Sequence, residues 1–236
     1  MYTSFYTAAR GAMEQQRKMD VVANNLANAN NNGFKSKNAK FRDLMYYNLN
    51  NYTGAQTPMK AGTGIVVETT DTDFTPAAFI TSNGEYDYAI ETEGFFMLQN
   101  PQNGEITYTR NGHFSLSLRG TTFYLINDNG NFVLDQNRRP ITVNNGVMSG
   151  TVSAYGFNIL DGMLNVGNNE FQPVEKNGQP YLLQAAKVRD HALEMSGTDV
   201  AEEFTHMIET QRAYSYVLRM VTTSDEVIST INSLRQ

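Results

Sequence analysis

Apolar residues recur at helical spacing in two segments, one near each end of the chain. Between residues 3 and 28 they return mostly every three or four positions, which places them on one face of an amphipathic helix. The same period returns at Val200 and continues almost to the last residue. At about 1.5 Å per residue this second helix is a rod roughly 55 Å long, a length typical of a coiled coil or a helical array.

The middle of the chain has the pattern of β-strands. From Ile65 to about Val188, short runs of β-branched and aromatic residues alternate with pairs of turn residues. Asn-Gly pairs at 111–112 and 129–130 separate such runs, and this pair favours the type I′ turn of a hairpin because both central residues need a positive φ. The pattern therefore predicts an antiparallel, all-β middle built from hairpins.

Turn and capping residues set the expected ends of the two helices. The amide-rich run at 28–33 ends the first helix, and Gly33 is suited to a positive φ there. Thr198 or Asp199 can cap the second helix, and the two glutamates that follow suit the positive end of its dipole. Both helices therefore have boundaries that agree with their apolar periods.

We predict an α+β fold: a discontinuous, coiled-coil-like helical domain of paired terminal helices, with an inserted antiparallel all-β domain. Residues 1–34 form the N-terminal assembly helix and turn, and 196–236 form the C-terminal assembly helix that packs with it. Residues 35–64 have no clear period and are expected to be a linker, while 65–195 form the β domain. An exposed amphipathic helix gains little stability until its apolar stripe is buried, so the two stripes are expected to need each other and further subunits.

Composition excludes several kinds of site. The net charge of −6 gives no basic field of the kind that binds nucleic acid. The absence of cysteine excludes disulfides, Cys-ligated zinc and a thiol nucleophile. No run of 18 or more apolar residues occurs, so no membrane insertion is expected, and the N-terminus lacks the apolar stretch of a secretory signal peptide.

Candidate catalytic and metal-binding patterns are weak. None of the three histidines has metal-ligand spacing to another, and the Asn-Asp-Asn-Gly-Asn run at 127–131 lacks the ligand spacing and closing glutamate of a calcium loop, so it is expected to be a turn. An enzyme such as a hydrolase of peptidoglycan would need two carboxylates across a cleft. Four carboxylates are close in sequence, and strand alternation places them on one solvated face: Glu85, Asp87, Glu91 and Glu93. No catalytic residue, cofactor or metal is therefore assigned.

Several stretches resemble one known family. Residues 21–35, VVANNLANANNNGFK, resemble the N-terminal signature of bacterial flagellar rod and hook proteins, which reads ANNLAN, a short variable stretch, then GFK or GFR. Residues 193–234 resemble the C-terminal segment of that family, although Gly197 stands where the family more often has Asn. Shorter stretches at 87–98 and 108–116 resemble its middle segments.

The resemblance implies a subunit of the bacterial flagellar basal-body rod, with distal and proximal positions both left open. In that family many copies form a helical tube that transmits torque, with the terminal helices inside and the β domain outside. The implied partners are copies of the chain itself, neighbouring axial proteins of the rod and hook, and the type III export apparatus that carries the chain beyond the cytoplasmic membrane. A secreted or cell-wall-associated binding module with helical ends is the alternative.

The expected assembly interface combines the N-terminal signature with an apolar, heptad-like stripe on the C-terminal helix. The signature contributes Ala23, Asn24, Asn25, Leu26, Asn28, Gly33 and Phe34. The C-terminal helix contributes Val200, Phe204, Met207, Ile208, Gln211, Tyr214, Leu218, Val221 and Ile228. A valine at position 33 is expected to impair assembly more than it impairs the β domain, because a β-branched residue is poorly tolerated at positive φ.

Overall fold

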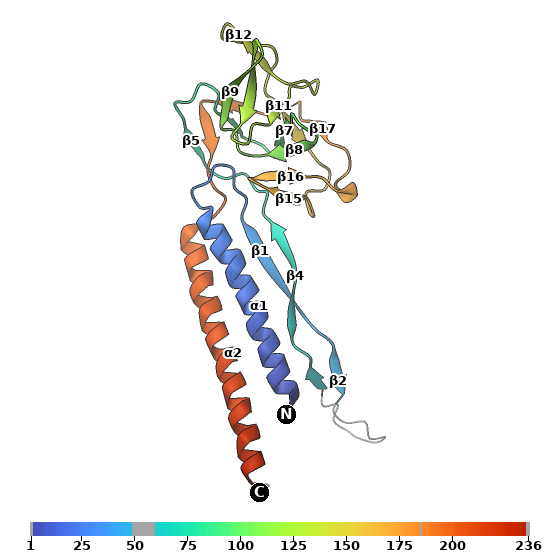
Figure 1. Ribbon diagram of the computed structural model, residues 1–236, viewed down its shortest axis with the longest axis vertical. Coiled ribbons are helices and arrows are strands. Elements are labelled where there is room, and N and C mark those ends of the chain that lie inside the picture. Colours follow the sequence, from blue (N-terminus) through green and yellow to red (C-terminus); the bar gives the residue numbers. More distant parts are fainter. Residues whose placement is uncertain (1, 49–59, 185, 235–236) are drawn as a thin grey trace. The chain divides into compact units, whose positions relative to one another are not determined.

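The computed structural model describes residues 2–48, 60–184 and 186–234 (Figure 1). The chain divides into two compact units. The first, called the helical unit here, consists of Met1–Ala27, Lys37–Asp71 and Asp199–Gln236. The second, called the β unit, consists of Asn28–Ser36 and Thr72–Thr198. An N-terminal helix, a C-terminal helix and a large antiparallel β unit between them confirm the α+β class.

Two long helices contact each other in the helical unit. Helix α1 spans Tyr2–Ala27 and helix α2 spans Val200–Leu234, and they run antiparallel side by side (Figure 1). The Asn25 amide near the end of α1 donates a hydrogen bond to Glu203 near the start of α2. The carboxylate of Asp199 accepts hydrogen bonds from the amides of Ala201 and Glu202, which confirms Asp199 as the cap of α2.

Burial on the two helices alternates at steps of three and four residues. On α1 the buried and half-buried positions at these steps are Phe5, Ala8, Ala12, Gln15, Met19, Val22 and Leu26. On α2 they are Glu203, Met207, Thr210, Tyr214, Val217, Val221, Ser224 and Ile228. A Cβ atom at Gly11 would lie 3.6 Å from Cγ1 of Val217, so small residues bring the helices close together.

A narrow β ribbon completes the helical unit. Strand β1 (Lys37–Asp43) pairs with β4 (Ile65–Thr72), and β2 (Tyr46–Asn48) pairs antiparallel with β3 (Lys60–Gly62). The expected linker at 35–64 is thus largely strand where it is described; its residues 49–59 lie outside the described part. The first strand of the expected β domain, β4, likewise belongs to the helical unit through Asp71.

The sequence pattern did not predict this ribbon, and there is a physical explanation. A two-stranded ribbon buries little on either face, so β1 has no alternation of apolar and polar residues that a pattern could detect. Charged pairs across β1 and β4 take the place of apolar contacts, as in the ion pair of 2.7 Å between Arg42 and Glu68. Such pairs look like ordinary surface residues in the sequence.

The β unit is a network of short antiparallel strands around one large sheet. Its main sheet has eleven strands, with the order β13-β12-β10-β11-β7-β8-β16-β15, and β9, β14 and β17 lie off this path. Two small sheets pair β18 with β6 and β19 with β5. The strands are β5 (Phe79–Thr81), β6 (Tyr88–Ile90), β7 (Phe95–Gln99), β8 (Ile106–Thr109), β9 (Phe114–Arg119), β10 (Thr122–Asn127), β11 (Phe132–Val133), β12 (Thr142–Asn144), β13 (Val147–Met148), β14 (Ala154–Gly156), β15 (Leu164–Gly167), β16 (Glu170–Gln172), β17 (Tyr181–Leu182), β18 (Val188–Asp190) and β19 (Ala192–Glu194), and a short 3₁₀ helix covers Glu175–Asn177.

Apolar side chains fill both faces of the central strand β7. Phe96 and Leu98 belong to one buried cluster, while Phe95 and Met97 belong to another. Successive residues of a strand point to opposite faces, so the continuous apolar run of β7 marks a strand that is covered on both sides.

One of the two predicted hairpins is confirmed and the other is wrong. β10 and β11 pair across the turn at 129–130, so this hairpin is confirmed, but only Gly130 has a positive φ, of 80°, and Asn129 does not, so the turn is not the predicted type I′. β8 and β9 do not pair with each other, so the Asn-Gly at 111–112 is not a hairpin turn. A Cβ atom at Gly112 would lie 1.7 Å from the carbonyl oxygen of Tyr88, so this glycine is required by close approach of two backbones.

Asp87 also departs from its expected environment. It was expected on a solvated face with three glutamates, but its side chain is buried and accepts a hydrogen bond from the hydroxyl of Ser82. The other three carboxylates are exposed. Asp87 lies at an isolated bridge to His113, where the alternation of a regular strand does not apply.

Candidate assembly interface

Asn25 occupies a buried polar site in the helical unit. Its Nδ2 donates to Oε1 of Glu203 at 2.7 Å and to the carbonyl of Lys37 at 2.8 Å, and its Oδ1 accepts from the amide of Lys37 at 2.9 Å. Both Asn25 and Glu203 are almost fully buried. Buried polar groups are costly unless they are bonded, so this one amide fixes α1, α2 and β1 in a single arrangement.

Glu14 makes a second link inside the helical unit. Its carboxylate is buried, accepts a hydrogen bond from the amide of Val67 in β4 at 2.9 Å, and pairs with Arg17 at 2.9 and 3.1 Å. The helical period alone places Glu14 on the polar side of α1. The structure shows that this side faces the ribbon, so the carboxylate holds the backbone of β4.

Gly33 has the predicted backbone conformation, with a φ of 66°. Its amide donates to the carbonyl of Glu194 at 2.8 Å, and a Cβ atom at this position would lie 2.5 Å from the amide nitrogen of Asn111. Both contacts are within the β unit. We predicted that a valine at position 33 impairs assembly more than it impairs the β domain, whereas these contacts indicate that its first effect is on the β unit.

A buried ion cluster follows directly after Gly33. The Lys35 ammonium lies 2.7 Å from Oε1 of Glu194, and Nε of Arg110 lies 2.8 Å from Oε2 of the same carboxylate. Lys35 also donates to the carbonyl of Thr75, and Arg110 donates to the carbonyl of Gly94 at 2.6 Å. Burial lowers the pKa of Lys35 from its ordinary value, and the nearby Glu194 carboxylate opposes that shift.

The ion cluster joins residues from three separate stretches of the sequence: 21–35, 108–116 and 193–234. Lys35 and Glu194 are 159 residues apart, and Arg110 and Glu194 are 84 apart. No local pattern could have revealed the cluster, although each residue lies within a stretch that resembles the flagellar family. All the bonds named here lie within the β unit, which indicates a structural role, although Nη2 of Arg110 is buried without a hydrogen-bond partner among the described residues.

The amide-rich turn at 127–131 is also a structural feature. The buried Glu170 carboxylate accepts hydrogen bonds from the amides of Asn127 and Asn131 at 2.8 and 3.0 Å and from the hydroxyl of Thr107 at 2.6 Å. The side chains of this turn therefore bind a protein carboxylate, in agreement with its prediction as a turn. Among the residues that the structure describes, no group of three or more His, Asp or Glu side chains could hold a metal ion.

The sequence-predicted interface residues fall into three environments. Those buried or half-buried in the helical unit are Asn25, Leu26, Met207, Tyr214, Val221 and Ile228. Those exposed on the helical unit are Ala23, Asn24, Val200, Phe204, Ile208, Gln211 and Leu218. Those in the β unit are Asn28, Gly33 and Phe34. The predicted apolar residues of α2 are thus divided between a buried seam and an outward face.

Further large apolar side chains are exposed on both helices and were not among the predicted interface residues. They are Tyr6 and Met13 on α1 and Tyr216, Met220 and Val227 on α2. Met13 was predicted on the apolar face of α1, but it is exposed; the others lie off the buried seam. Exposed apolar surface on this scale is typical of a protein that binds others.

The fold and these surfaces define an assembly protein built on two long helices. In the described residues, no helix is long and apolar enough to cross a bilayer. Three family models match the chain in order: "Flagella basal body rod protein" at residues 5–35, "Flagellar hook protein FlgE/F/G D1 domain" at 89–157, and "Flagellar basal body rod FlgEFG protein C-terminal" at 189–234.

Full-length relatives agree with these models. The chain is 30% identical to the flagellar basal-body rod protein FlgG of Buchnera aphidicola subsp. Schizaphis graminum, over 99% of this chain and 100% of the relative. It is 30% identical to FlgG of Borreliella burgdorferi over the whole of both chains, and 29% identical to the rod protein FlgF of Caulobacter vibrioides over 96% and 95%. The chain therefore belongs to the family of flagellar basal-body rod proteins, and it is a structural subunit and not an enzyme.

Proposed function

We propose that this rod subunit polymerises through α1 and α2 into a helical axial tube that transmits torque. Within one subunit the two helices pack as an antiparallel coiled coil. The alternating three- and four-residue burial on both helices supports this packing, because it is the period of a heptad seam. The polar site at Asn25 supports a fixed register, since it pairs with Glu203 at one level of the seam only.

The observation that carries the proposal is the apolar surface left outside that seam. Phe204 and Ile208 remain 49% and 51% exposed on one side of α2. Tyr216 and Met220 remain exposed nearer its end. Two helices cannot cover these side chains themselves, so neighbouring helices are needed to bury them. Repeated copies would supply such helices at every subunit.

The proposed partners are copies of the chain, neighbouring rod and hook proteins, and the type III export apparatus. The relatives are flagellar basal-body rod proteins, which supports a place for this chain in the basal body. The negative net charge and the family membership give no role to nucleic acid. In this scheme the β unit is on the outside of the tube and the helical unit lines its inner part.

Concentration-dependent assembly tests the proposal. Sedimentation velocity of the full chain should show larger species as concentration rises, and circular dichroism should show a parallel gain in helix content. The double variant Phe204→Asp/Ile208→Asp should stay monomeric at the same concentrations, because each copy would bury two unpaired carboxylates. Phe204→Leu/Ile208→Leu, which keeps both positions apolar, is the matched control and should assemble. A double variant that assembles like the control would contradict the proposal.

A further inference from the structure

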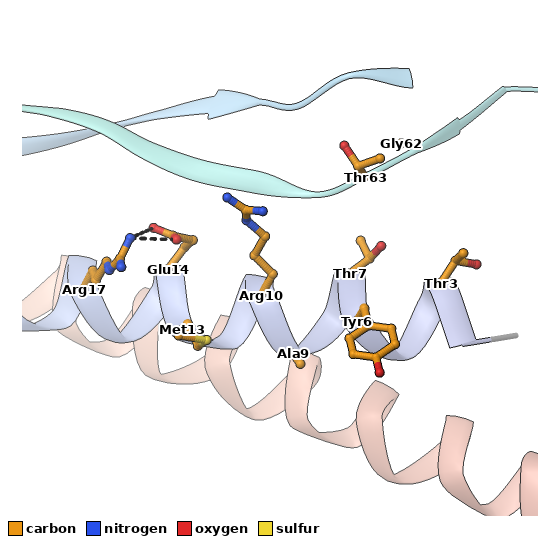
Figure 2. Close-up of a pocket in the computed structure, with 10 residues that line it drawn as sticks. All are labelled: Thr3, Tyr6, Thr7, Ala9, Arg10, Met13, Glu14, Arg17, Gly62 and Thr63. Carbon is orange, nitrogen blue, oxygen red and sulfur yellow. Dashed lines mark hydrogen bonds and ion pairs between the residues drawn. The ribbon is translucent and has the colours of Figure 1, made fainter. Parts of the chain in front are cut away.

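Two hollows in the described part of the chain have similar volumes but different linings. The first, of about 580 Å³, follows one face of α1 in the helical unit, where Tyr6, Met13 and Arg10 line it (Figure 2). Its exposed apolar side chains are of the kind that protein partners bury. The second, of about 510 Å³, lies wholly within the β unit and has a polar lining. The two hollows therefore suit different ligands.

The polar hollow is here called the asparagine cleft. Its walls come from four segments of the β unit, within 28–32, 109–113, 127–129 and 168–169. Nine of its twelve lining residues are asparagines, and the other three are a threonine, a histidine and an aspartate. Its volume is in the range of clefts that bind small molecules, but such clefts are usually lined mostly by apolar side chains.

Hydrogen bonds between these segments hold the walls of the asparagine cleft in place. The hydroxyl of Thr109 donates to the carbonyl of Asn169 at 2.8 Å, and Nδ2 of Asn169 donates to the carbonyl of Asn32 at 3.3 Å. Nδ2 of Asn111 donates to the carboxylate of Asp128 at 3.3 Å. The cleft is therefore formed before a ligand arrives, which lowers the entropic cost of binding.

Three asparagine side chains of the cleft make no hydrogen bond to another described residue: Asn30, Asn32 and Asn168. Asn30 and Asn168 are exposed, and Asn32 is half-buried. A side-chain amide has two N–H donors and a carbonyl oxygen with two acceptor lone pairs. The cleft thus offers free donors and acceptors side by side, which suits a ligand whose groups both donate and accept.

The lining of the asparagine cleft disfavours other classes of ligand. Its only titratable side chains among the described residues are His113 and Asp128, which pair with each other at 2.8 Å. No lysine or arginine of the described chain lines it, so a phosphate or a nucleic acid would find no counter-charge. Nor does any aliphatic or aromatic side chain that the structure describes, so a lipid or an apolar protein anchor would bury nothing there.

We propose that the asparagine cleft binds a neutral saccharide. A sugar hydroxyl donates one hydrogen bond and accepts others, and an acetamido group does both as well, so either matches the free amides. Without a charge or an aromatic ring to add affinity, one cleft should bind weakly, with a dissociation constant of about 1 mM or higher. Only one consequence rests on the proposed function: the repeated clefts of a polymer would hold a polymeric saccharide more tightly than a short one.

An NMR titration of the full-length chain, labelled with nitrogen-15 and kept dilute, tests binding to a single cleft. The probes are two neutral trisaccharides: maltotriose, a hexose, and triacetylchitotriose, an N-acetylated sugar. At least one should shift the side-chain amide signals of Asn30, Asn32 and Asn168, and the comparison shows which type of sugar fits. The affinity should be the same at about 0.1 M and about 1 M salt, because the ligand is uncharged. No shift at roughly 50 mM of either sugar, or an affinity that falls with salt, would overturn the proposal.

Paired substitutions locate the binding. Asn30→Ala/Asn32→Ala removes two free amides and no side-chain hydrogen bond within the described chain, so the β unit should keep its fold, as circular dichroism would verify. Binding should weaken on the order of tenfold. The matched control, Asn137→Ala/Asn144→Ala, changes two exposed asparagines of the β unit outside the cleft and should bind like the wild type. Equal affinities of the cleft pair and the control pair would overturn the site.

Sedimentation velocity of the same samples separates this proposal from the proposed function. If the chain assembles and neither sugar shifts the amide signals, the saccharide site is overturned and the proposed function stands. If the chain stays monomeric at every concentration and a sugar binds, the saccharide site stands and the proposed function is contradicted. If the three amide signals shift on self-association and with neither sugar, the cleft is a contact between subunits and the saccharide site is again overturned.

Discussion

The buried ion cluster of the β unit gives the most quantitative prediction. Two cations, Lys35 and Arg110, share the single carboxylate of Glu194, and all three side chains are at most 1% exposed. Glu194→Gln removes the only carboxylate of this cluster and leaves two buried positive charges facing each other. Lys35→Met removes one cation and leaves Arg110 and Glu194 as a balanced pair.

The two substitutions should therefore differ in size. Breaking a buried ion pair typically costs about 3–5 kcal/mol, since the remaining charge is left without compensation. We expect Glu194→Gln to cost the β unit at least this much, and Lys35→Met to cost clearly less. For a unit of this size, a loss of about 3 kcal/mol lowers the midpoint of thermal unfolding by roughly 10 °C.

Thermal and urea unfolding of the full chain, followed by near-ultraviolet circular dichroism of the β-unit tyrosines, would measure both losses. Equal losses for the two variants, or a larger loss for Lys35→Met, would refute the claim that Glu194 neutralises the cluster.

Three further predictions concern other parts of the β unit. Gly33→Val should destabilise the β unit by about 3 kcal/mol or more and Gly33→Ala nearly as much, because either adds a Cβ against the backbone of Asn111; an unchanged urea midpoint would contradict this. Burial raises the pKa of Tyr108 to about 12, so the folded state keeps its proton while the unfolded state loses it above pH 10; stability should fall between pH 10 and 12, and Tyr108→Phe should reduce that fall. Limited proteolysis of the dilute monomer should remove the terminal helices first, while the fragment with residues 28–36 stays bound to the β core; its release on gel filtration would argue against the assigned unit boundary.

Long periodic segments were the most predictable part of this fold. The two helices follow from apolar residues repeated over many turns. The cap of α2 could be narrowed to Thr198 or Asp199, and the structure selects Asp199, whose carboxylate accepts hydrogen bonds from amides two and three residues away. The hairpin at 129–130 could likewise be predicted from the local Asn-Gly pair. In each case the residues that determine the structure are neighbours in the sequence.

The rest depended on contacts between distant residues. Gly112 resembles a hairpin glycine, yet it is required by the carbonyl of Tyr88, which lies 24 residues earlier. The ribbon of β1 and β4 lacks an alternating pattern because neither strand has a fully covered face. On α2 the apolar residues are divided between a seam and an outward face, and which residue belongs to which surface depends on where α1 packs.

The central claim is that the outward face of α2 is an assembly surface, and Leu218 tests it most directly. Leu218 is exposed in the single chain and lies outside the β unit, so Leu218→Asp should leave the unfolding of the β unit unchanged. The variant would be expressed in motile bacteria in place of the wild-type chain, beside Leu218→Met, which keeps the position apolar, as the control. Isolated basal bodies should contain the control but not Leu218→Asp, and only the control cells should swim, because a buried unpaired carboxylate repeats its cost of several kcal/mol in every copy. Basal bodies that contain Leu218→Asp at the level of the control, in cells that swim, would contradict the account.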